Sequence, residues 1–169
     1  MLGNPVVQPP AEAHLNVPFI RQQGHTCWLI TATMVRSYHN QMTFANPSLQ
    51  GFGSNGLDIH EEGRFDAYLR SYSIAIKENN IQSVAQLAQI LLQQGPVWAM
   101  TPSGDHCIVI TGAFKKLGVD WTTCNDSGRN DGAGRLMYFA DFQKHPIIGI
   151  YSPNAFSGQP TDEHYGEWV

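Results

Sequence analysis

The chain has 169 residues, of which 42% are hydrophobic and 14% charged, and its formal net charge is −4. This length and composition fit one domain with an ordinary hydrophobic core. We expect no nucleic-acid partner, because nucleic-acid binding needs a concentrated positive surface. No apolar run is long enough to cross a bilayer, and the first sixteen residues lack the basic and apolar segments of a signal peptide, so no membrane partner is expected.

The cysteine content bears on disulfide and metal chemistry. There are three cysteines, Cys27, Cys107 and Cys124, and no two of them have C-x-x-C spacing. This odd number indicates neither a disulfide scaffold nor a structural zinc site, and we expect reduced thiols. Cys107 directly follows His106, so in an extended segment their side chains would point to opposite faces. The histidines other than His25 and His106 share no chelating spacing, so no metal is expected.

The first half of the chain is predicted to be mainly helical. Residues 1–16 form an extended arm, since their prolines block a helix. A short β-prone segment follows at residues 17–21. Periodic apolar residues predict helices at 27–39, with Thr26 as N-cap, and at 58–69. A third helix begins after the N-cap residue Ser83 and stops at Gly95-Pro96.

The second half is predicted to be rich in strands. One short strand is expected earlier, at 72–76, and the others at 97–100, 106–114, 121–125, 135–139 and 147–151. The segment 106–114 is apolar on both faces, which is typical of a central strand. Helices followed by strands predict an α+β domain over residues 17–152. Residues 153–169 are polar and contain Gly and Pro, so we expect an arm or surface loop there.

Cys27 is a candidate nucleophile because it lies in the first turn of a predicted helix. The free N–H groups and the dipole at a helix N-terminus favour the thiolate, which is the nucleophilic form. A glutamine shortly before it, Gln22 or Gln23, could direct its amide at an oxyanion, with the backbone N–H of Cys27 as second donor. The alternative is a small buried hydrophobic side chain, as most free cysteines are.

His106 is the candidate general base. It opens the predicted central strand, at the edge of the core, where a half-buried imidazole could meet a thiolate; the alternative is a structural histidine. Asn125 and Asp126 end the next predicted strand, and either could orient the imidazole through Nδ1. Because successive side chains alternate, only one of the two should reach His106. Their alternative role is an Asx turn into Gly128.

The order of these residues resembles that of papain-like peptidases. The similarity is specific to bacterial papain-like cysteine peptidases related to the double-glycine leader peptidases, and it covers about residues 17–145. It implies a papain-like fold, in which an N-terminal helical part carries the nucleophile and packs on a C-terminal antiparallel sheet. Four motifs carry the resemblance: Val17-Pro18-Phe19-Ile20 through Cys27-Trp28, Gly95-Pro96-Val97-Trp98, His106 through Gly112, and Asn125-Asp126 with Gly128.

The resemblance also implies roles for single residues. Cys27 corresponds to the nucleophile, His106 to the base, Asp126 to the orienting acid and Gln22 to the oxyanion residue. The family's glutamine usually lies six residues before the cysteine, whereas Gln22 lies five before it, which leaves Gln23 as a competitor. In the family a proline usually follows the aspartate, and Ser127 takes its place here.

The resemblance further implies a cysteine endopeptidase that forms a thioester and prefers glycine before the cut. We expect a protein substrate and no cofactor. Related domains occur as bacterial effectors and toxins, so we expect delivery or secretion as part of a larger polypeptide, action in a reducing compartment and a cognate inhibitor or immunity protein. The alternatives are an amidase acting on cell-wall peptides and a catalytically silent papain-like binding module.

Overall fold

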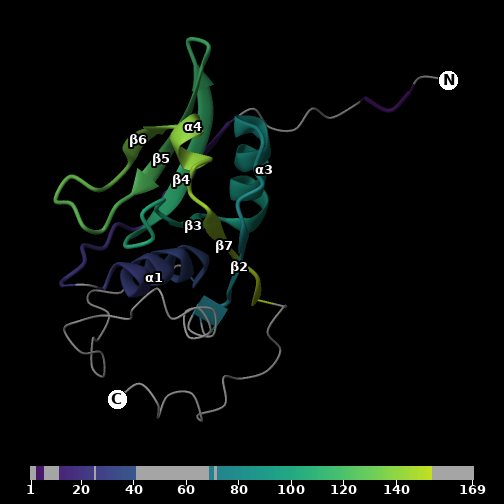
Figure 1. Ribbon diagram of the computed structural model, residues 1–169. Coiled ribbons are helices and arrows are strands. Elements are labelled where there is room, and N and C mark those ends of the chain that lie inside the picture. The colour runs from purple at the N-terminus through teal and green to yellow at the C-terminus, as the bar shows by residue number, and fades with distance from the viewer. Residues whose placement is uncertain (1–2, 6–11, 25, 41–68, 71, 154–169) are drawn as a thin grey trace.

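The computed structural model describes residues 3–5, 12–24, 26–40, 69–70 and 72–153 (Figure 1). Within these residues seven strands form one antiparallel sheet in the order β2-β7-β3-β4-β5-β6, and β1 also pairs with β4. The elements in chain order are β1 (Ala13–His14), α1 (Cys27–Asn40), β2 (Ile74–Glu78), α3 (Val84–Gln94), β3 (Val97–Met100), β4 (Cys107–Lys116), β5 (Val119–Asn125), β6 (Arg135–Tyr138), α4 (Phe139–Phe142) and β7 (Ile147–Tyr151).

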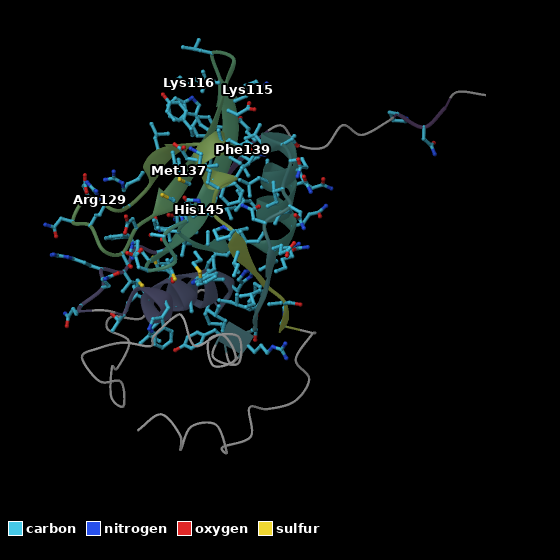
Figure 2. All side chains as sticks on the ribbon, viewed as in Figure 1. Lys115, Lys116, Arg129, Met137, Phe139 and His145 are labelled. Atoms are coloured by element: carbon cyan, nitrogen blue, oxygen red, sulfur yellow. The ribbon has the colours of Figure 1, made fainter. Side chains whose placement is uncertain are left out.

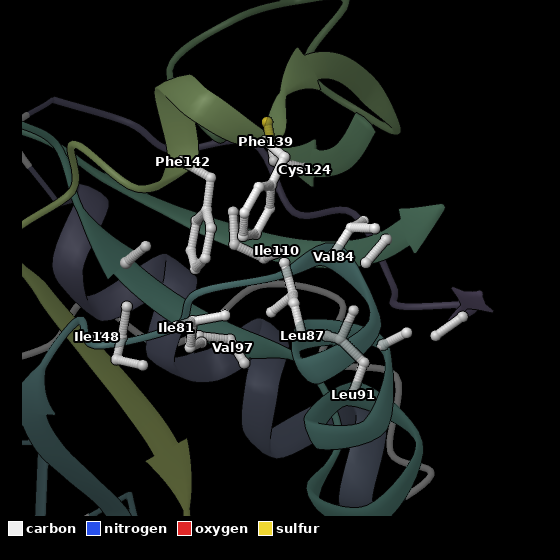
Figure 3. Close-up of a cluster of buried hydrophobic side chains, with 14 of the residues drawn as sticks. Ile81, Val84, Leu87, Leu91, Val97, Ile110, Cys124, Phe139, Phe142 and Ile148 are labelled. Carbon is white, nitrogen blue, oxygen red and sulfur yellow. The ribbon is translucent and has the colours of Figure 1, made fainter. Parts of the chain in front are cut away.

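The sheet separates two hydrophobic clusters, one on each face. On β3, Val97 and Ala99 face one side and Trp98 and Met100 the other, as the alternation of strand side chains requires. Helices α3 and α4 contribute to the first cluster (Figure 3), and α1 contributes to the second. The domain therefore has three layers, and the helix that begins with Cys27 covers one face of the central strands.

Most of the predicted elements are found. The α+β class is confirmed, β3 and β7 have the predicted bounds, and β4 is central because it pairs with both β3 and β5. Helix α3 begins after Ser83, whose side chain accepts a hydrogen bond from the backbone of Gln86. It ends at Gly95, where the positive φ of 89° suits a residue without a side chain.

Two strand predictions need correction. No strand forms at 17–21, because single hydrogen bonds hold this part of the chain in place of a ladder. The Asn125 amide donates to the carbonyl of Val17, and just after the segment the backbone N–H of Gln22 donates to the carbonyl of Ser127. The strand predicted at 72–76 begins at Ile74, since Ser73 has a φ of 59°, which no strand tolerates. The helix predicted at 58–69 lies, apart from its last residue, outside the described residues.

The ends of the predicted domain are only partly described. Ala13 and His14, which fall within the predicted arm, pair with Ala113 and Gly112 of β4. The inner end of the arm is therefore part of the sheet. In the described part of the chain, no helix is long and apolar enough to cross a membrane.

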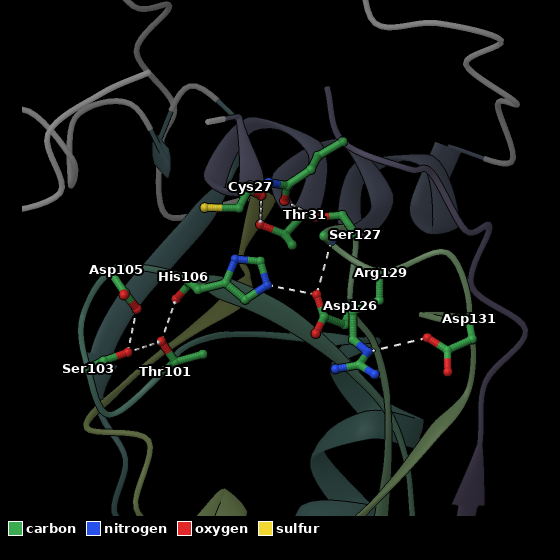
Figure 4. A network of polar contacts seen from close by, with 12 residues as sticks. Cys27, Thr31, Thr101, Ser103, Asp105, His106, Asp126, Ser127, Arg129 and Asp131 are labelled. Carbon is green, nitrogen blue, oxygen red and sulfur yellow. Dashed lines mark hydrogen bonds and ion pairs between the residues drawn. The ribbon is translucent and has the colours of Figure 1, made fainter. Parts of the chain in front are cut away.

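The hairpin of β4 and β5 extends away from α1 (Figure 2). Figure 2 shows Lys115 and Lys116 at its tip, where Leu117 and Gly118 both have positive φ, as a tight two-residue hairpin turn requires. The opposite end of this hairpin lies beside the N-terminus of α1, so the start of β4 and the end of β5 meet the first residue of that helix (Figure 4).

Candidate active site

The N-terminus of α1 places Cys27 at the edge of the core. Thr26 occupies the N-cap position, since its carbonyl accepts the first helical hydrogen bond, from Ile30, at 3.0 Å. The Thr26 hydroxyl donates to the carbonyl of Gln23 at 2.8 Å, which fixes the approach to the helix. The first turn contains no acidic side chain, so nothing in it opposes a negative charge on the sulfur of Cys27.

His106 lies in the turn that joins β3 to β4. The backbone N–H of Thr101 donates to the carbonyl of His106 at 2.9 Å, and the Thr101 hydroxyl donates to the same carbonyl at 3.1 Å. Gly104 closes the turn with a φ of 74°. These bonds fix the backbone of His106 and leave its imidazole half-buried, facing the N-terminus of α1 (Figure 4).

Asp126 contacts the side of the ring that points away from Cys27. Nε2 of His106 lies 2.7 Å from Oδ1 of Asp126, and the backbone N–H of Gly128 donates to the same oxygen at 3.0 Å. This arrangement leaves Nδ1 on the side of Cys27 (Figure 4). The prediction that the orienting residue bonds Nδ1 is therefore wrong, because the ring lies between the two partners with Nδ1 toward the sulfur.

The two reactive groups shift each other's pKa in opposite directions. Hydrogen bonding from the thiol of Cys107, followed by hydrogen bonding and charge from His106, lowers the pKa of Cys27 to about 5 despite its burial. Hydrogen bonding with Cys27, and then with Asp126, raises the pKa of His106 to about 9 although burial opposes the charge. Between these pKa values, Cys27 and His106 form a thiolate–imidazolium pair.

Asn125, the predicted alternative to Asp126, is directed elsewhere. Its buried amide donates to the carbonyl of Val17 at 3.2 Å, and its Oδ1 accepts from the backbone N–H of Gly134 at 2.9 Å. Asp126 therefore contacts the imidazole, whereas Asn125 joins β5 to the segment before α1 that contains Val17. This outcome agrees with the expectation that only one of the two reaches the ring.

Gln22 and Gln23 also differ in whether their side chains are held at the site. Gln22 is half-buried, and its side-chain amide is held at both ends: Oε1 accepts from the Ser127 hydroxyl at 2.8 Å, and Nε2 donates to the carbonyl of Gly24 at 3.0 Å. The Gly24 carbonyl requires a donor opposite it, so it fixes which end of the amide is the NH₂ group. Gln23 is exposed.

Two residues at this site have contacts that the sequence did not predict. Ser127 is fully buried and joins the loop after Asp126 to Gln22 through both its hydroxyl and its carbonyl. Cys107 lies on the same buried face as Cys27, and interaction with its thiol is the first cause that lowers the pKa of Cys27. The expected separation of His106 and Cys107 applies to an extended segment, whereas His106 lies before the strand begins, and both residues lower the pKa of Cys27. Because residues two apart in a strand share a face, the buried Val109 could have indicated that Cys107 also faces α1.

The fold and this arrangement define a papain-like cysteine peptidase. The family model described as papain-like cysteine protease AvrRpt2 matches residues 11–145, and the chain belongs to this family. No curated protein matches the chain significantly. Among the residues that the structure describes, no group of three or more His, Cys, Asp or Glu could hold a metal ion.

Solved structures of cysteine proteases share the fold. A double glycine motif protease from an AMS/PCAT transporter, in complex with the leader peptide, is 16% identical, with a TM-score of 0.54 over 84% of this chain and 95% of that one. The proform of Amb a 11, a cysteine protease and ragweed pollen allergen, is 12% identical, with a TM-score of 0.53 over 89% of this chain and 69% of that one. At these identities the likeness concerns the fold.

The pKa of Cys27 predicts selective alkylation. At about pH 6 iodoacetamide should label Cys27 much faster than Cys107 or Cys124, because only a thiol with a lowered pKa is then largely thiolate. His106→Ala should slow the labelling of Cys27 by removing hydrogen bonding and charge that lower its pKa. Peptide mapping by mass spectrometry measures all three rates, and equal labelling of the three cysteines would contradict the assignment.

Proposed function

We propose that the chain is an endopeptidase that cleaves a protein substrate with a Cys27–His106–Asp126 triad and with Gln22 in the oxyanion hole. The observation that supports this proposal most is the position of the His106 ring, with Oδ1 of Asp126 at 2.7 Å on one side and Cys27 on the other (Figure 4). A histidine held between a carboxylate and a thiolate can transfer protons in both halves of a peptidase reaction.

The reaction then proceeds through a covalent intermediate. The thiolate of Cys27 attacks the carbonyl carbon of the peptide, and the imidazolium of His106 protonates the departing amine. The resulting thioester is hydrolysed by water that His106, now neutral, activates as a general base. Asp126 keeps Nδ1 directed at the sulfur and stabilises the imidazolium in both halves of the reaction.

The contacts of Gln22 favour it over Gln23 as the oxyanion residue. One N–H of its amide is used by the carbonyl of Gly24 at 3.0 Å, and an NH₂ group has a second N–H to give. The hydroxyl of Ser127 holds Oε1, so the amide is already oriented before substrate binds. The backbone N–H of Cys27, at the start of α1, is the second donor.

The proposed substrate has glycine before the scissile bond, and the proposed context is a bacterial effector or toxin domain with a cognate immunity protein. The glycine preference is supported by the resemblance to leader peptidases and by the shared fold with a double glycine motif protease. Mass spectrometry of products from a protein library tests it: bulky residues before most cuts would contradict it. Cleavage of purified peptidoglycan peptides instead would indicate the amidase alternative.

Asp126→Ala should lower turnover by roughly 10²-fold or more, because the imidazole loses its orientation and its partner charge. Cys27→Ala should abolish turnover, and both variants should keep a melting temperature near that of the parent. A peptidase assay and thermal unfolding measure these effects. Activity should fall as the pH drops below the pKa of about 5 for Cys27, where the thiolate is protonated. It should also fall as the pH rises above the pKa of about 9 for His106, where the imidazolium loses its proton.

Asn125→Ala is the matched control, one residue away. Removing its buried amide leaves the carbonyl of Val17 and the N–H of Gly134 without their partner, which should destabilise the fold by about 1–3 kcal/mol. Turnover well below the melting transition should stay within a few-fold of the parent. If Asn125→Ala is the inactive variant and Asp126→Ala stays active, the assignment of the orienting residue is wrong.

The oxyanion assignment has its own pair of variants. Gln22→Glu keeps the oxygen that Ser127 contacts but loses the NH₂ donor, so kcat should fall by roughly 10²-fold while KM changes little. Gln23→Glu makes the same change on an exposed side chain and should be nearly silent. Steady-state kinetics on one peptide substrate compares the two, and the reverse pattern would assign the role to Gln23.

A further inference from the structure

Cys107 is a second thiol near the site, and it forms no bond to the substrate in the proposed mechanism. It is fully buried, at 0% exposure, and belongs to the same hydrophobic cluster as Cys27, which is 7% exposed. Alternation along β4 directs Cys107, like Val109, toward α1, and Cys27 is the first residue of that helix. A second thiol thus lies on the face of the sheet that α1 covers, on the same side as Cys27.

The two cysteines begin the two elements that pack together there, Cys27 the helix α1 and Cys107 the strand β4. Their pKa shifts agree with this proximity: interaction with the thiol of Cys107 lowers the pKa of Cys27, and interaction with Cys27 adds to the burial that raises the pKa of Cys107. Both thiols are free. A thiol held close to a second sulfur can attack that sulfur once it has been oxidised, because disulfide formation then needs no large backbone movement.

We propose that Cys107 is a resolving cysteine, which captures oxidised Cys27 as a Cys27–Cys107 disulfide and so makes inactivation by peroxide reversible. The inference rests on the proposed role of Cys27 as nucleophile. It identifies a redox modification site within the active site, for which the oxidant is hydrogen peroxide or another small hydroperoxide.

The chemistry has two steps. The thiolate of Cys27 attacks one peroxide oxygen, the O–O bond breaks, and the leaving hydroxide takes the proton of the His106 imidazolium to form water. Cys27 is then a sulfenic acid. The sulfur of Cys107 next bonds to the sulfur of Cys27, the S–O bond breaks, and the hydroxide leaves with the thiol proton of Cys107 as a second water. The two thiols have lost two electrons, and the peroxide has gained them.

The surroundings fix the order of these steps. Burial, followed by its hydrogen bond with Cys27, raises the pKa of Cys107 well above its ordinary value, so Cys107 stays a thiol and does not itself react with peroxide. Cys27 is the thiolate and is oxidised first. Capture as a disulfide prevents further oxidation to the sulfinic acid, which thiol reductants do not reverse.

Cys124 offers a matched control. It is also buried and has a raised pKa, of about 11, caused first by burial. It lies in the other hydrophobic cluster, on the face covered by α3 and α4 (Figure 3), so the sheet separates it from Cys27. Replacing Cys124 removes a buried thiol of the same kind without touching the pair.

The experiment treats the reduced chain with hydrogen peroxide, blocks remaining thiols with N-ethylmaleimide and maps the cysteines by mass spectrometry. The parent and Cys124→Ser should both yield the Cys27–Cys107 cross-linked peptide, and dithiothreitol should restore most of their starting activity. Cys107→Ser should yield Cys27 as sulfinic or sulfonic acid, and dithiothreitol should restore little of that variant's own starting activity.

Other products would overturn the inference. Sulfinic acid at Cys27 with Cys107 still blocked by N-ethylmaleimide in the parent, or a disulfide that includes Cys124, would exclude Cys107 as the resolving cysteine. The cross-link is mapped without any substrate, so its formation is separable from peptidase activity. An active chain that forms no cross-link would refute only this inference, whereas a cross-linked chain that cleaves no peptide when reduced would refute the proposed function.

Discussion

The position of the His106 ring between a thiol and a carboxylate is the constraint on which the rest of the site depends. A free cysteine at neutral pH is mostly protonated, and a free imidazole is mostly neutral. Contact with Cys107 and His106 lowers the pKa of Cys27, and contact with Cys27 and Asp126 raises that of His106. The thiolate and the imidazolium therefore stabilise each other at neutral pH, and a shift of either side chain would remove both charged forms.

The fold maintains this arrangement by joining three separate segments of the chain. The turn before β4 carries His106, the loop after β5 carries Asp126, and the N-terminus of α1 carries Cys27. Neighbouring strands align the first two, since β4 and β5 are paired up to Val109 and Asn125. The helix is tied to the sheet by its own polar contact, because the indole N–H of Trp98 in β3 donates to the Thr31 hydroxyl at 2.9 Å, and that hydroxyl donates to the carbonyl of Cys27 at 2.7 Å.

Sequence patterns could predict the elements and the order of the site residues, because periodicity and strand ends are local properties. The choice between Asp126 and Asn125 needed the tertiary structure, since both follow the same strand and only packing shows that Asn125 turns to Val17. The ring nitrogen that faces Asp126 was predicted wrongly, because it depends on the direction from which the imidazole enters the site. Ser127 and Cys107 gained their contacts from segments distant in sequence, Gln22 and Cys27, which no local pattern relates to them.

The central claim, that Cys27 is a thiolate paired with His106, is tested most directly by a titration of the ultraviolet absorbance of the thiolate. The difference between the parent and Cys27→Ala isolates one sulfur, since Cys107 and Cys124 remain in both chains. The absorbance of one thiolate should appear as the pH rises through about 5, and His106→Ala should move this midpoint upward. A midpoint near the ordinary pKa of a free thiol, unchanged by His106→Ala, would contradict the ion pair.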